Sequence, residues 1–69
     1  MWYVRRVVWE TIFPEGVLIA SGKLMVEASS LQKAENEFSA LAAQLGWGAE
    51  VGFGQISTPF ETRAAAERA

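Results

Sequence analysis

Residues 2–28 read WYVRRVVWETIFPEGVLIASGKLMVEA, and their pattern is the strongest indication of the architecture of the chain. β-Branched and aromatic side chains dominate residues 2–13 and return over residues 17–28, which is typical of strands. Between them, Phe-Pro-Glu-Gly at residues 13–16 is a turn signal, because proline presets φ and the final glycine accepts a positive φ. The stretch therefore predicts two antiparallel strands joined by a short turn.

Ser21-Gly22 interrupts the second of these strands. Two explanations fit the sequence. The first is a β-bulge, which inserts one extra residue into a strand. The second is another tight turn, which would create an additional short strand.

A helix is predicted after the hairpin. Ser29 can accept a hydrogen bond from the backbone N–H of Gln32, whose side chain can reach back as in a capping box; Ser30 is the other candidate cap. Gly46 supplies the stop. The apolar residues recur in steps of three and four, which predicts an amphipathic helix of about four turns. They are Leu31, Ala34, Phe38, Leu41 and Leu45.

Residues 49–57 alternate again and predict a third strand, which Pro59 ends. The tail over residues 60–69 has high helix propensity, with Arg63 and Glu67 spaced four apart. A helix this short does not hold in isolation, so the tail is expected either to dock or to fray.

The element order is β-β-α-β within a single α+β domain spanning residues 1–69. A right-handed crossover through the helix brings the third strand back parallel to the second. The first strand then lies between them. We therefore expect a three-stranded antiparallel sheet of order 2-1-3, with the helix packed on one face.

A period of two assigns the strand side chains to two faces. The row expected to meet the helix is almost purely apolar and comprises Tyr3, Val7, Trp9, Phe13, Leu18, Ala20, Leu24, Val26, Ala28, Val51 and Phe53. Arg5 and Thr11 are the exceptions on this row. A bulge at Arg5-Arg6 would let both arginines reach water and would bring Trp2 and Val4 into the core.

The face away from the helix is predicted to be the working surface, because it mixes charges with large apolar residues. Its expected partner-binding residues are Arg6, Val8, Glu10, Ile12, Ile19, Lys23, Met25, Glu27, Glu50 and Ile56. A monomer rarely exposes a large contiguous apolar patch, so a second copy, the tail or another protein is expected to cover it. Arg6 and Lys23 are expected to pair with the glutamates. Mixed charges suit a homodimer, because a two-fold axis can set opposite signs against each other.

The composition removes most catalytic chemistry. The 69 residues include no cysteine and no histidine, and every acidic residue is a glutamate. A disulfide framework, a structural zinc site and a histidine base are therefore excluded. Two glycine-containing segments, residues 46–48 and 52–54, match neither phosphate-binding spacing and are interpreted as turn and strand glycines. We expect no enzymatic activity, no metal, no cofactor and no small-molecule substrate.

The net charge of −2 is a poor match for duplex nucleic acid. Arg5 and Arg6, lying among Trp2, Tyr3 and Trp9, offer an alternative function in binding single-stranded nucleic acid by charge and stacking. No apolar run approaches the roughly 20 residues that span a bilayer, and no signal peptide is recognisable. We therefore expect a cytoplasmic protein that does not engage membranes.

Residues 22–34 (GKLMVEASSLQKA) run from a strand through Glu-Ala-Ser-Ser into a helix. This pattern resembles small phage-encoded α/β proteins, and it is similar to small anti-CRISPR inhibitors of type I systems. The resemblance implies a short sheet backed by one helix that binds a surface of the Cascade complex. Because that family shares no catalytic motif, no functional residue is carried over. The leading hypothesis is a non-enzymatic protein-binding module, with a phage-type inhibitor as its narrower form; a purely structural homodimer is another alternative.

Overall fold

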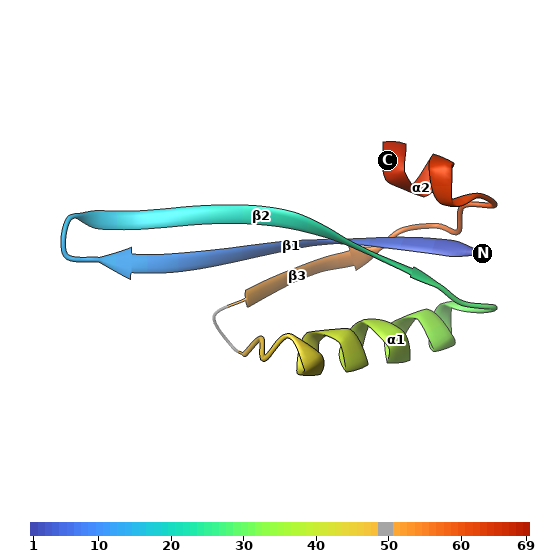
Figure 1. Ribbon diagram of the computed structural model, residues 1–69, viewed down its shortest axis with the longest axis horizontal. Helices are drawn as coiled ribbons and strands as arrows, with labels where there is room; N and C mark the ends of the chain where they lie inside the picture. The colour runs from blue at the N-terminus through green and yellow to red at the C-terminus, as the bar shows by residue number, and fades with distance from the viewer. Residues whose placement is uncertain (49–50) are drawn as a thin grey trace.

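The computed structural model describes residues 1–48 and 51–69. Over these residues the chain forms a three-stranded sheet in the order β2-β1-β3, with β1 antiparallel to both neighbours (Figure 1). The elements are β1 (Trp2–Phe13), β2 (Gly16–Glu27), α1 (Leu31–Gln44), β3 (Val51–Ile56) and α2 (Arg63–Arg68). The predicted α+β class, the strand order and the central place of the first strand are confirmed.

The β1–β2 hairpin is regular along its whole length. Pairing runs from Trp2↔Glu27 to Phe13↔Gly16, and Gly16 adopts the positive φ of 151° that the turn signal indicates. Ser21 and its neighbour Gly22 form ordinary cross-strand pairs, so the predicted interruption of this strand, whether bulge or turn, is wrong.

Gly22 is needed for a different reason than a break in the strand. A Cβ atom built on Gly22 would lie 3.3 Å from the indole ring of Trp9. Trp9 pairs with Ala20, so its ring reaches diagonally across the sheet to the next position on the same face. The glycine therefore provides the space that the Trp9 ring occupies.

The start of α1 differs from the predicted capping box. Ser30 is the N-cap, and its hydroxyl oxygen accepts a hydrogen bond from the Lys33 N–H at 3.3 Å. The Gln32 side chain instead donates to the Asn36 side chain at 3.5 Å, so it does not reach back to Ser29. The box fails because the helix begins one residue later than the Ser29 alternative requires.

Ser30→Ala is expected to lower the free energy of unfolding by about 1 kcal/mol, because one N–H in the first turn loses its partner. Ser29→Ala is the matched control and should change stability by less than about 0.5 kcal/mol, as for an ordinary surface position. Urea unfolding followed by circular dichroism measures both. Equal effects of the two substitutions would place the cap elsewhere.

The end of α1 is the glycine stop that the sequence predicts. Gly46 has a φ of 71° and donates to the Ala43 carbonyl at 3.2 Å. Trp47 donates to the Ala42 carbonyl at 3.1 Å. This pair of backward hydrogen bonds is a Schellman motif, which satisfies carbonyls that the helix itself leaves unpaired.

The core lies between α1 and one face of the sheet. Tyr3, Ala34 and Phe38 are buried there, and four partly buried residues pack around them: Leu24, Val26, Ala28 and Ile56. The helix stripe is buried only in its middle, since Leu31 and Leu45 are 51% and 48% exposed. The predicted stripe is therefore confirmed at Ala34 and Phe38 but not at its two ends.

A β-bulge lies in β3 rather than at the predicted position in β1. Arg5 pairs with Ile56, whereas Val7 pairs with Phe53, so Gly54 and Gln55 together stand opposite one residue of β1. Such an extra residue turns the following side chain to the other face. Ile56 consequently joins the core under α1, and its predicted place on the open face is wrong.

Arg5 remains on the α1 face without being buried in the core. Its guanidinium lies over the Phe53 ring, 5.0 Å from the centroid, and its Nε donates to the Gly54 carbonyl at 2.8 Å. The arginine therefore lies along the β3 edge of the sheet.

The second helix occupies the other side of the molecule. Figure 1 shows α1 below the sheet and α2 above it, both near the end where the N-terminus lies. Within residues 1–48 and 51–69, neither helix is long and apolar enough to cross a membrane.

Candidate functional site: the projecting hairpin

The C-terminal tail covers part of the sheet face that α1 leaves open. It covers the inner half, which is the half near the N-terminus (Figure 1). α2 packs on β1, where Ala66 is fully buried and Val4 is only 5% exposed. Val4 alternates with the core residue Tyr3 and so faces away from α1. The expectation that the tail docks or frays is thus resolved in favour of docking.

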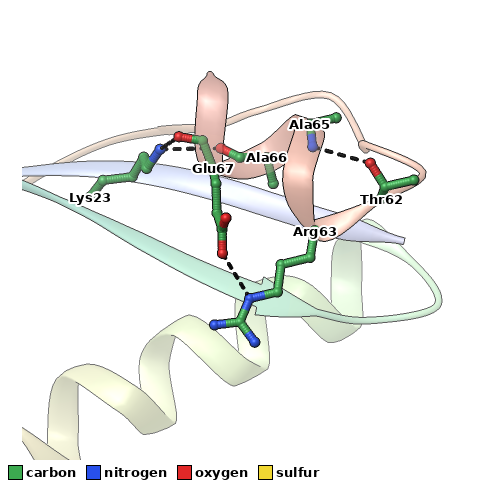
Figure 2. Close-up of polar contacts among 6 residues, drawn as sticks. All are labelled: Lys23, Thr62, Arg63, Ala65, Ala66 and Glu67. Atoms are coloured by element: carbon green, nitrogen blue, oxygen red, sulfur yellow. Dashed lines mark hydrogen bonds and ion pairs between the residues drawn. The ribbon is translucent and has the colours of Figure 1, made fainter.

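Two strand cations hold the end of α2. Lys23 Nζ donates to the backbone oxygens of Ala66 and Glu67 at 3.2 and 2.6 Å (Figure 2), and also to that of Ala69 at 3.2 Å. Arg6, the cross-strand partner of Lys23, donates to the same Ala69 oxygen at 2.9 Å. Positive charge at a helix C-terminus is favourable, because the last carbonyls are unpaired and the helix dipole is negative there.

Contacts within the tail complete its anchorage. The Thr62 hydroxyl accepts from the Ala65 N–H at 3.1 Å and caps α2, as Figure 2 shows. The predicted pair of Arg63 and Glu67 forms at 3.0 Å on the same helix. Arg63 also lies over the Trp2 ring, 5.6 Å from its centroid.

The outer half of the hairpin has no such cover. All ten residues from 10 to 19, which we call the arm, are exposed, and Figure 1 shows the arm projecting beyond both helices. The molecule measures 44 × 23 × 16 Å. Its radius of gyration is 13.5 Å, whereas a compact chain of this length has about 11 Å.

The accessible surface area also indicates that the chain is less compact than usual for its size. The chain exposes 4858 Å², whereas a compact monomer of this mass exposes roughly 4300 Å². The ten exposed residues of the arm contribute to this surplus. The excess is apolar in part, since large hydrophobic residues of the arm are uncovered on both of its faces.

The face of the arm that points away from α1 carries the larger apolar area. Three residues of the arm and the adjoining Val8 form this surface, which we call the arm patch: Val8, Ile12, Val17 and Ile19. Ile12 is 79% exposed and Ile19 is 63% exposed. Ile12 pairs directly with Val17, and Ile19 pairs with Glu10, so the patch is contiguous across two strands.

The opposite face of the arm, on the side of α1, exposes fewer large apolar residues. Phe13 and Leu18 are about half exposed there and line a shallow hollow of about 380 Å³ at the hairpin tip. The covered region begins at Trp9, whose ring lies 5.9 Å from that of Trp47; Trp47 in turn lies 6.2 Å from Phe53. This aromatic cluster marks the inner limit of the arm.

The predicted partner-binding residues therefore divide into separate groups. Val8, Ile12 and Ile19 share the arm patch with exposed Glu10 beside them. Arg6 and Lys23 serve α2, and Met25 is half-buried near them. Glu27 is exposed at the far end of β2, Ile56 is in the core, and Glu50 lies outside the described residues.

The predicted pairing of Arg6 and Lys23 with strand glutamates is wrong for the part of the chain that the structure describes. Neither Glu10 nor Glu27 makes an ion pair there. The reason is that both cations are already bonded to the backbone oxygens of α2.

Sequence analysis did not predict the reach of the arm, and it wrongly expected Phe13 and Leu18 to be covered by the helix. A signal was present in the lengths of the elements. Strands of 12 residues span about 40 Å, whereas a helix of 14 residues spans about 21 Å. One short helix therefore covers only about half of such a hairpin.

The geometry gives the single-stranded nucleic-acid alternative no support. Arg5 and Arg6 are successive strand residues, so they point to opposite faces, and each is engaged by backbone oxygens. Tyr3 is buried in the core and cannot stack on a base. Over residues 1–48 and 51–69, no three acidic side chains cluster closely enough to hold a metal ion.

Comparisons of the chain with protein-family models, with curated proteins and with solved structures find no match. The choice of a functional surface therefore rests on the geometry of the chain itself. By that measure the arm patch is the strongest candidate, because its four large apolar residues are exposed side by side on a sheet face.

Proposed function

We propose that this chain is a non-enzymatic protein-binding module of the cytoplasm that binds its partner through the arm patch. One observation carries the proposal: ten successive exposed residues project on a two-stranded ribbon, and three large apolar side chains on one of its faces continue into the exposed Val8. Exposed apolar area of this kind costs free energy in water. Fully burying one such side chain contributes about 1.5–3 kcal/mol, which a partner surface recovers.

The size of the surface fits a modest interface. The chain exposes roughly 550 Å² more than a compact monomer would. A standard protein interface buries about 800 Å² on each partner. The surplus is about two-thirds of that area, so it is of the size that one partner of a modest interface buries.

The charges on the arm indicate what kind of partner suits it. Glu10 and Glu15 are the charged residues of the arm, and the arm contains no lysine or arginine. An apolar groove with a basic rim is the complementary surface, because opposite charges steer the encounter and fix the register. Basic surfaces that hold nucleic acid have this character, which supports the narrower proposal of a phage-type inhibitor acting on a host defence complex.

Photo-cross-linking tests the proposed function. A photoreactive amino acid at position 12 is expected to give a discrete protein adduct in bacterial lysate, because Ile12 is the most exposed residue of the patch. The same reagent at position 11 is the matched control, since the Thr11 side chain points to the opposite face. Mass spectrometry identifies the adduct.

The charge variant Val8→Glu makes this test specific. A carboxylate inside the arm patch should remove the position-12 adduct, because an unpaired charge is costly to bury in an interface. Circular dichroism should remain that of the wild type, since Val8 is 43% exposed and outside the core. An adduct that survives Val8→Glu, or the absence of any adduct at position 12, would refute the proposed function.

A further inference from the structure

Within residues 1–48 and 51–69, β2 is an edge strand, since β1 is its one neighbour in the sheet. The backbone bonds of β1 show which of its groups face β2. Val4 O accepts from the Ser57 N–H at 2.8 Å, and Trp2 exchanges two bonds of 2.8 Å with Phe60, so even-numbered β1 residues bond away from β2. Odd-numbered residues therefore bond to β2.

This alternation fixes the free groups on the outer edge of the hairpin. Thr11 bonds to Leu18, and Trp9 bonds to Ala20, because those are the cross-strand partners of odd-numbered β1 residues. The backbone N–H and C=O groups of the odd-numbered residues of β2, which alternate with these partners, point outward. These outward residues are Val17, Ile19 and Ser21, and all three are exposed.

The outer half of this edge has none of the usual protection against strand addition. Proteins guard exposed edges with charges, proline, bulges or a covering element. Residues 16–22 (GVLIASG) contain no charge and no proline, and their register with β1 is unbroken. Protection begins only further along, where Lys23 is bonded to α2.

We propose that β2 pairs edge to edge with β2 of a second copy of this chain, antiparallel about a two-fold axis at Ile19. This register sets the two Ile19 residues opposite each other, so that their outward backbone groups meet as a hydrogen-bonded pair. Val17 of one copy faces Ser21 of the other. The interaction is isologous, which is the form that closes into a dimer.

Charge favours this register over the neighbouring one. With the axis at Ile19, residues 16–22 of the two copies pair with each other, and no charged residue lies within the paired segment. With the axis moved to Ser21, Lys23 would lie within the paired segment, opposite Ile19 of the other copy. A charge on an edge strand disfavours strand addition, so the pairing at Ile19 is preferred.

The proposal goes beyond the proposed function and uses a different surface. Edge pairing consumes backbone groups of β2 and leaves the arm patch facing outward. The two arm patches then lie side by side on one four-stranded ribbon. Both helices lie at the inner end of each molecule, as Figure 1 shows, so they do not obstruct the paired arms.

Single-cysteine variants test the axis, because the natural chain contains no cysteine. Ile19→Cys is expected to form a symmetric disulfide dimer in a glutathione redox buffer, since opposed Cα atoms in a hydrogen-bonded pair lie about 5.5 Å apart. Leu18→Cys is the matched control. Its own copy sits diagonally across the axis, beyond the roughly 7 Å limit for a disulfide. Equal cross-linking of the two variants would overturn the proposal.

Ser21→Pro tests the edge hydrogen bonds without removing an apolar side chain. Proline deletes the outward N–H of Ser21 but none of the bonds to β1. Sedimentation equilibrium up to millimolar concentration should show a wild-type monomer–dimer equilibrium, an unchanged Kd for Ser21→Ala and a Kd about tenfold higher or more for Ser21→Pro. Circular dichroism checks that each variant is folded.

A wild type that stays monomeric over this range overturns the dimer, as does Ser21→Pro that is folded with an unchanged Kd. The proposed function is judged separately, by the Val8→Glu-sensitive adduct at position 12. A monomeric chain that still gives such an adduct with another protein refutes the dimer alone.

Discussion

Phe38→Ala is expected to lower the free energy of unfolding by about 3–5 kcal/mol, which is the usual cost of emptying a buried aromatic position. Phe38 is 1% exposed and lies at the middle of the core between α1 and the sheet. A chain of 69 residues has little stability to lose, so the variant should be largely unfolded at room temperature.

Urea titration followed by far-ultraviolet circular dichroism measures this loss, with the midpoint and the slope fitted together. Leu45→Ala is the matched control, since Leu45 follows the same helix and is 48% exposed. It should cost less than about 1 kcal/mol, as for a partly exposed position. A loss below that size for Phe38→Ala would show that α1 does not pack on the sheet through this residue.

The sequence contained most of the information that specifies this fold. Two local signals predict the hairpin, namely the β-branched runs and the Phe-Pro-Glu-Gly turn. Both agree with the observed register. Gly46 predicts the end of the helix directly, because glycine accepts the positive φ of a helix stop at low cost. Where two local signals point the same way, the prediction holds.

The start of α1 shows where local signals do not suffice. Ser29 and Ser30 are chemically identical caps, and only the position of the first helical residue distinguishes them. That position depends on how the strand ends against the sheet. Helix ends are therefore predicted less securely than helix faces.

The bulge in β3 could not be read from alternation. Gly52 and Gly54 have no side chain, so the alternation of inward and outward side chains in this strand is incomplete. A shift of one residue in the strand register therefore cannot be detected from the sequence. Ile56 was consequently assigned to the wrong face. The physical cause is that register in a strand is specified by its side chains, and a glycine-rich strand specifies it weakly.

The exposure of the apolar candidate residues could be predicted from the sequence, whereas the contacts of the charged ones could not. Alternation alone places Val8, Ile12 and Ile19 on one face, and the structure leaves all three exposed there. The role of Arg6 and Lys23 depends on α2, which is separated from them by more than forty residues. Such a long-range contact has no signature in a single sequence.

Ala66→Asp is expected to release α2 from the sheet and to lower the free energy of unfolding by about 2–4 kcal/mol, since an unpaired charge would be buried. Ala66 is fully buried over β1, so there is no room for a hydrated carboxylate. A helix of six residues does not persist when undocked. Its helical signal should therefore disappear with the contact.

Ala64→Asp is the control that isolates burial, because Ala64 lies on the exposed side of the same helix and receives the same charge. Urea unfolding should separate the two variants by at least about 1.5 kcal/mol. Equal stability of the two would show that α2 does not hold the inner face of the sheet.

The same pair of variants tests how α2 limits the binding surface. Release of α2 uncovers Val4 and Met25, which continue the apolar row of the arm patch toward the N-terminal end of β1. It also frees Lys23 and Arg6 from the helix carbonyls. Binding of a hydrophobic dye and self-association should therefore both rise in Ala66→Asp and stay at the wild-type level in Ala64→Asp. Under the proposed function, the tail confines partner binding to the arm, because α2 covers the other half of the same sheet face.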